Sequence, residues 1–122
     1  MKHLLLAIAF LLTFPALAQT TAPPAYDFLT VLEIESPYPV PASSLSFVPA
    51  SQGLAPIKLE QLPGPYSDKY MPAYLRNLEV VNQQLNSLTA SGWELMHVSN
   101  MAGWAILQSV AGHEYLFRRL KK

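Results

Sequence analysis

His97, His113 and Glu114 are the residues whose types and spacing point most directly to chemistry. If the last two predicted strands form a long hairpin centred near Ala105, His97 lies roughly opposite His113. Two imidazoles and a carboxylate arranged in this way could hold a divalent metal ion. The alternative is that they are single exposed side chains without a shared ligand.

Other chemistries find no support in the sequence. There is no nucleophile-elbow, phosphate-loop, dinucleotide-binding or zinc-protease motif, and thiol chemistry is excluded because the chain has no cysteine. A glycosidase would need two carboxylates across a cleft. The acids on predicted strands are instead expected at solvated edges: Asp27, Glu33, Glu35, Glu94 and Glu114. We therefore expect no catalytic residue and no cofactor.

The charge balance argues against nucleic acid as a partner. Eight basic and eight acidic residues give a net charge of zero, which provides no long-range field for a polyanion. The basic C-terminal end is more simply a solvated terminus. Trp104 is the aromatic residue best placed to belong to a contact surface, although it could equally be buried.

The first 18 residues have the pattern of a secretory signal peptide. A positive start is followed by an apolar run over 4–12, and small residues at Ala16 and Ala18 suit a signal peptidase. The run is shorter than the roughly 20 residues that a membrane span needs. We expect cleavage after Ala18, a flexible leader over 19–25, a single domain over 26–122, and a secreted or periplasmic protein without stable membrane insertion.

The elements of that domain follow from hydrophobic periodicity. Residues 26–35 are rich in β-branched and apolar side chains and predict a central strand. Apolar side chains then recur every three or four residues, which predicts a long helix ended by Gly92. This stripe consists of Tyr74, Leu78, Val81, Leu85 and Leu88, and Asn77 falls outside it. Strands are expected over 93–99 and 113–120, and Trp93 is expected to pack beneath the helix.

Two segments leave alternatives open. Seven of the eleven prolines lie in the insertion at about 36–66, where 44–48 and 57–61 could be edge strands or parts of an irregular loop. Residues 100–112 could contain a strand or form a long loop.

A family resemblance rests on the helix and the strands around it. Leu85, Leu88, "GWEL" at 92–95 and "YLFRR" at 115–119, preceded by the strand "YDFLTVLEI", resemble the small bacterial domain of unknown function 4177 family. The similarity is greatest to its secreted members, which carry a proline-containing segment after the first strand. It implies an α+β domain, in which one long helix packs on a small antiparallel sheet of three to five strands. It implies no catalytic residue, and it gives Gly92, Trp93, Leu85 and Leu88 structural roles.

One helix can cover only one face of such a sheet. Leu29 and Val31 of the first strand, and Leu116 of the last, are expected on the second face. The proline-rich insertion could fold back over that face, which we favour, or two copies could pair through it as a homodimer. We expect a non-catalytic interaction module that contacts a protein partner or itself. The alternatives are a small metal-dependent or hydrolytic enzyme and a structural envelope component.

Overall fold

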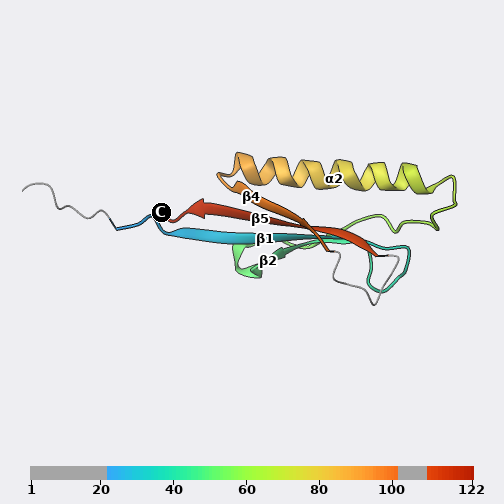
Figure 1. Cartoon of the computed structure of the whole chain (residues 1–122), viewed down its shortest axis with the longest axis horizontal. Helices are drawn as coiled ribbons and strands as arrows, with labels where there is room; N and C mark the ends of the chain where they lie inside the picture. Colours follow the sequence, from blue (N-terminus) through green and yellow to red (C-terminus); the bar gives the residue numbers. More distant parts are fainter. Residues whose placement is uncertain (1–21, 102–109) are drawn as a thin grey trace, which may run out of the picture.

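One long helix lies on one face of an antiparallel sheet, which is the expected α+β architecture (Figure 1). The computed structural model describes residues 22–101 and 110–122. Its elements, in chain order, are β1 (Tyr26–Glu35), β2 (Ser44–Val48), the short 3-10 helix η1 (Ala50–Gln52), β3 (Ile57–Lys58), α2 (Tyr70–Ala90), β4 (Glu94–Asn100) and β5 (Ala111–Leu120). The predicted signal peptide over 1–18 and most of the uncertain segment 100–112 lie outside the described residues. No helix among the described residues has the length and apolar character needed to cross a membrane.

The sheet has the strand order β3-β2-β1-β5-β4, and every pair of neighbours is antiparallel. β1 is the central strand, as expected, and all ten of its residues pair with β5. Both of its edges are therefore hydrogen-bonded, which fits its β-branched composition. Residues 22–25 before it are exposed and have no regular secondary structure.

The helix ends as the sequence predicts. Gly92 has a φ of +89°, its N–H donates to the Thr89 carbonyl, and the Trp93 N–H donates to the Leu88 carbonyl at 3.1 Å. This pair of bonds is the Schellman motif, in which glycine takes the left-handed position. Leu88 and Trp93 are both buried, and Leu85 packs against the same core. The structural roles expected for these four residues agree with their positions.

The core lies between α2 and the face of β1 that carries Leu29 and Val31. The expectation that these two residues lie on the second face is wrong. In the antiparallel register, Val31 lies between Phe47 and Tyr115, and Leu29 lies beside Phe117, so this face is continuously apolar across three strands. The helix covers that face because it offers the larger apolar surface.

The opposite face alternates apolar and polar neighbours. Leu32 lies between Ser46 and Glu114, and Phe28, 55% exposed, lies beside Arg118. Leu116 is on this face, as expected. No helix of the described residues covers it (Figure 1).

The proline-rich insertion extends the sheet and does not fold over its second face. Strands form at 44–48 and at Ile57–Lys58, as one alternative proposed. β2 lies between β1 and β3, so of these two only β3, which is shorter than expected, is an edge strand. Leu45, Phe47 and Leu59 enter the core beneath α2. The favoured prediction that this insertion covers the second face is therefore wrong, and pairing of two copies through that face stays a prediction.

Candidate functional site

The three residues proposed as metal ligands do not converge. His97 lies opposite Leu116 in the register, on the face away from α2, whereas His113 lies opposite Asn100 and contacts Glu33 on the helix face. Glu114 is exposed on the face away from α2. The described residues contain no group of three His, Asp or Glu side chains able to hold a metal ion. The assumed hairpin register differs from the observed one by three residues, and β4 also has an irregularity between Leu95 and His97.

The other expected contact residue, Trp104, lies outside the described residues. Trp93 is 5% exposed, and the guanidinium of Arg119 lies 4.3 Å from the centre of its ring. This arrangement makes Trp93 a packing residue beneath α2 and leaves little of its surface for a ligand.

Two buried carboxyl groups form a site that the sequence analysis missed. Glu33 is 1% exposed and Glu35 is 3% exposed, so the expectation that both lie at solvated edges is wrong. They alternate with Ile34, and residues two apart on a strand point to the same face. That face is the one that carries Leu29 and Val31. The apolar stripe beneath α2 therefore continues into two acids at the end of β1.

Neighbouring β5 provides the partners of Glu33. The Tyr115 hydroxyl donates to Glu33 Oε2 at 2.5 Å, and His113 Nδ1 lies 3.2 Å from the same oxygen. Burial raises the pKa of Tyr115, and the hydrogen bond to Glu33 raises it further. The phenol therefore stays protonated and acts as a donor throughout the physiological range.

Glu35 is less well satisfied than Glu33. Its Oε1 atom is buried and has no hydrogen-bond partner among the described residues. Burial raises the pKa of Glu35 to about 7, the nearby charge of Glu33 contributes to the rise, and the Asn77 amide opposes part of it. A buried carboxyl with this pKa exchanges a proton with solvent near neutral pH.

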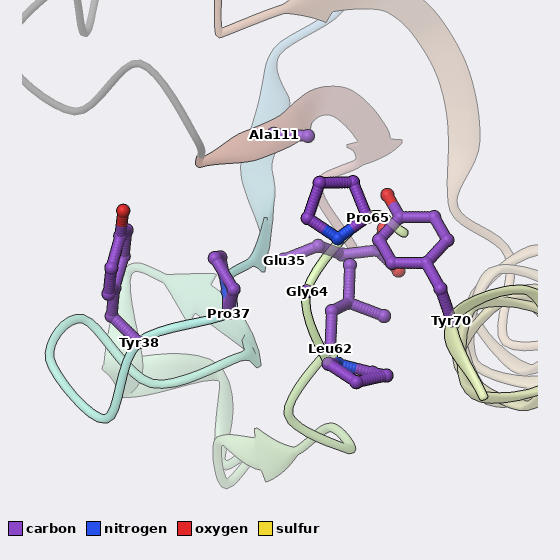
Figure 2. Close-up of a pocket in the computed structure, with 9 residues that line it drawn as sticks. Glu35, Pro37, Tyr38, Leu62, Gly64, Pro65, Tyr70 and Ala111 are labelled. Carbon is purple, nitrogen blue, oxygen red and sulfur yellow. The ribbon is translucent and has the colours of Figure 1, made fainter. Parts of the chain in front are cut away.

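A pocket of about 500 Å³ opens beside Glu35, where β1 ends and α2 begins. Figure 2 shows Pro37 and Tyr38 on one side of it, Tyr70 on the other, and Glu35 between them. The remaining lining residues are Leu62, Pro63, Gly64, Pro65 and Ala111. Apart from Glu35, the side chains are apolar or aromatic. A pocket with mostly apolar walls and few polar groups is typical of a small-ligand site.

Hydrogen bonds between α2 and the segments that follow β1 and β3 hold the walls of this pocket in place. Asn77 of α2 is buried; its Oδ1 accepts from the Glu60 N–H at 2.8 Å and its Nδ2 donates to the Glu60 carbonyl at 2.9 Å. The Leu62 N–H donates to the Ser36 carbonyl at 3.1 Å, and Gln61 Nε2 donates to the Pro37 carbonyl at 2.7 Å. These bonds join the two proline-bearing walls to each other and to the helix, so the pocket is formed without a ligand.

Comparison with known proteins does not identify the site. No protein-family model, no curated protein and no solved structure matches the chain.

Proposed function

We propose that the protein is a non-catalytic binding module that acts outside the cytoplasm and recognises its partner by a group inserted into the Glu35 pocket. The observation that carries this proposal is the buried, incompletely hydrogen-bonded Glu35 carboxyl in a preformed pocket with apolar and aromatic walls. The pattern of residues 1–18 supports the compartment. The resemblance to the domain of unknown function 4177 family implies no catalytic residue and is compatible with such a module.

Binding is favoured over catalysis by the composition of the pocket. Hydrolysis needs a second group, such as a nucleophile, another carboxyl or a metal ion, that converges with the first on the reacting atom. Among the described lining residues, Glu35 is the only carboxyl, and Tyr38 and Tyr70 contribute only phenols. Glu33 lies between the sheet and the helix, where it is hydrogen-bonded to Tyr115, and it does not line the pocket.

A small hydrolytic enzyme is the second candidate, and one observation favours it. Because the pKa of Glu35 is about 7, the group could act as a general acid or base at neutral pH. Turnover of chromogenic ester and glycoside substrates that is lost in Glu35→Gln would favour this candidate over the binding module.

The proposal is tested by screening small neutral, cationic and anionic fragments by NMR. A true pocket ligand should shift the backbone amides of Gly64, Tyr70 and Ala111. Gly64→Leu should weaken or abolish these shifts, because it adds a bulky side chain at a lining position where a Cβ meets no atom within 4 Å. Ala90→Leu, at an exposed position at the end of α2, serves as the matched control. Fragments that shift only the amides of the open sheet face, around Phe28, would contradict the proposal.

A further inference from the structure

We propose that the Glu35 pocket binds a primary ammonium group carried on an apolar chain. This inference rests on the proposed binding function and adds the chemical class of the ligand. The charge, the hydrogen bonding and the lining of the pocket support the ammonium assignment.

The acids at the end of β1 have no lysine or arginine counterpart among the described residues. Glu33 and Glu35 lie on the same face of the strand, and neither forms an ion pair with a lysine or an arginine of the described residues. Among the described residues, the ion pair formed by these two acids is that of Glu33 Oε2 with His113 Nδ1, at 3.2 Å. An ionised carboxylate that is buried without a counter-charge is costly, so a cation that enters the pocket stabilises the ionised form of Glu35.

The hydrogen bonding at Glu35 requires a donor. Oε1 is buried and has no partner among the described residues. The Asn77 amide, which hydrogen-bonds both backbone groups of Glu60, also lowers the pKa of Glu35 but leaves this oxygen without a donor. An ammonium group carries three N–H donors and no acceptor, which matches an unpaired carboxylate oxygen. A ligand carboxylate or phosphate would instead place a third negative charge beside Glu33 and Glu35.

The walls suit the carbon chain of such a ligand. Leu62, Pro63 and Pro65 offer apolar surface, and the ring of Tyr70 borders the pocket beside Glu35 (Figure 2). An aromatic face next to a carboxylate attracts an alkylammonium ion through the electrostatic potential of the ring. A volume of about 500 Å³ accommodates an amine of several carbons.

The start of α2 opposes a cation, but weakly. The N-terminus of a helix carries about half a positive charge, which falls off within the first turn. The Tyr70 N–H is already bonded to the Ser67 carbonyl at 3.1 Å, and Pro72 has no N–H to offer. Two carboxyl groups at the end of β1 outweigh this partial charge.

Ammonium binding should be coupled to the proton on Glu35. The titratable groups around it are Glu33 on β1, Tyr70 and Tyr74 on α2, and His113 and Tyr115 on β5. Burial raises the pKa of both Tyr74 and Tyr115, so neither phenol ionises near neutrality. Because the pKa of Glu35 is about 7, the ligand displaces a proton from this group at acidic pH and meets the carboxylate at pH 8.

The test is an NMR titration of the protein with n-butylammonium chloride and, as a neutral match, n-butanol. At pH 8 we expect n-butylammonium to shift the amides of Gly64, Tyr70 and Ala111 and to bind at least about tenfold more tightly than n-butanol. Glu35→Gln should weaken the binding of n-butylammonium by about 30-fold, because it removes the buried counter-charge. Glu114→Gln removes the same charge at an exposed position and should leave the affinity unchanged.

Wild-type protein provides a second readout that does not depend on the folding of a variant. Its affinity for n-butylammonium should fall by more than about tenfold from pH 8 to pH 5.5, because only protein with an ionised Glu35 binds the cation tightly. N-acetyl-lysine amide distinguishes two sources of the ligand. Tighter binding than n-butylammonium would indicate a lysine side chain of a partner protein, and weaker binding would indicate a free small amine.

Equal binding of n-butylammonium and n-butanol, or an affinity insensitive to Glu35→Gln and to pH, would overturn the ammonium assignment and leave the binding module in place. Absence of pocket shifts with either probe would also overturn it. Failure of every fragment, whatever its charge, to reach the pocket would overturn the proposed function itself.

Discussion

Replacing Glu35 with glutamine should change how the stability of the protein depends on pH. The carboxyl is 3% exposed, and burial raises its pKa from 4.5 to about 7. Glutamine keeps the size and hydrogen-bonding shape of a protonated glutamate and cannot ionise. The difference in unfolding free energy between the two proteins therefore isolates the titration of this one group.

The sign follows from proton binding. Between pH 4.5 and 7 the unfolded chain releases the Glu35 proton while the folded protein keeps it, so the stability of wild type falls as the pH rises through this window. Below pH 4.5 both states are protonated, and above pH 7 both are ionised, so the contribution is constant outside the window. At about 1.4 kcal/mol per pH unit, the full change amounts to about 3 kcal/mol. This is a large part of the 5–15 kcal/mol typical of a domain.

Urea unfolding of both proteins at pH 4, 5, 6, 7 and 8 measures this change. We expect wild type to lose about 3 kcal/mol relative to Glu35→Gln between pH 4 and pH 8. Groups that titrate alike in both proteins cancel in the difference. Glu114→Gln, at an exposed position, should run parallel to wild type at every pH. A difference between wild type and Glu35→Gln that stays constant from pH 4 to pH 8 would refute the reasoning.

Four further predictions concern the core, the site and the N-terminus. Trp93→Ala should cost about 3–5 kcal/mol in urea unfolding, since a large buried ring is removed; a cost under about 1 kcal/mol would mean that the ring is exposed in solution. Tyr115→Phe should cost about 1–3 kcal/mol by leaving buried Glu33 without its hydroxyl donor, and an unchanged urea midpoint would contradict the hydrogen bond. Gly112→Ala should cost about 1–3 kcal/mol in thermal unfolding, because the new Cβ would collide with the Glu33 carbonyl oxygen, and a neutral effect would argue against this close approach. Intact-mass measurement of exported protein should find a chain that starts at Gln19, and retention of the first 18 residues would remove the basis for the proposed compartment.

Local periodicity was sufficient to predict the long helix and the strands β1, β4 and β5. Helical spacing in the stripe and a glycine stop predicted the long helix, and the observed Schellman bonds at Gly92 and Trp93 agree with that interpretation. The paired central strand was also predicted correctly from its composition. These features depend on residues close together in the chain.

Local periodicity could not predict which face of β1 packs against the helix. Both faces of 26–35 are apolar, and the outcome depends on the neighbours that the register supplies: Phe47, Tyr115 and Phe117 on one face, and Ser46, Glu114 and Arg118 on the other. Register is a long-range property that strand composition does not specify. The wrong choice of face also made the proline-rich insertion look like a cover for the second face.

The wrong assignment of the faces of β1 is also the reason why the buried pair Glu33 and Glu35 was not predicted. With Leu29 and Val31 assigned to the core face, strict alternation would have placed Glu33 and Glu35 beneath the helix as well, so a signal was present. Asn77 carried a similar signal. It lies four residues before the buried Val81, and residues four apart lie on the same face of a helix. The pocket walls could not have been predicted, because they depend on bonds between residues 17 to 26 positions apart in the chain.

The most direct test of the account is the pKa of the Glu35 side chain itself, measured by NMR through the carboxyl carbon with and without n-butylammonium. The account predicts a pKa near 7 in the free protein, because burial and the charge of Glu33 oppose ionisation, and a lower pKa when the pocket holds the cation. A free-protein pKa near 4.5, or a pKa that n-butylammonium leaves unchanged at saturating concentration, would contradict it.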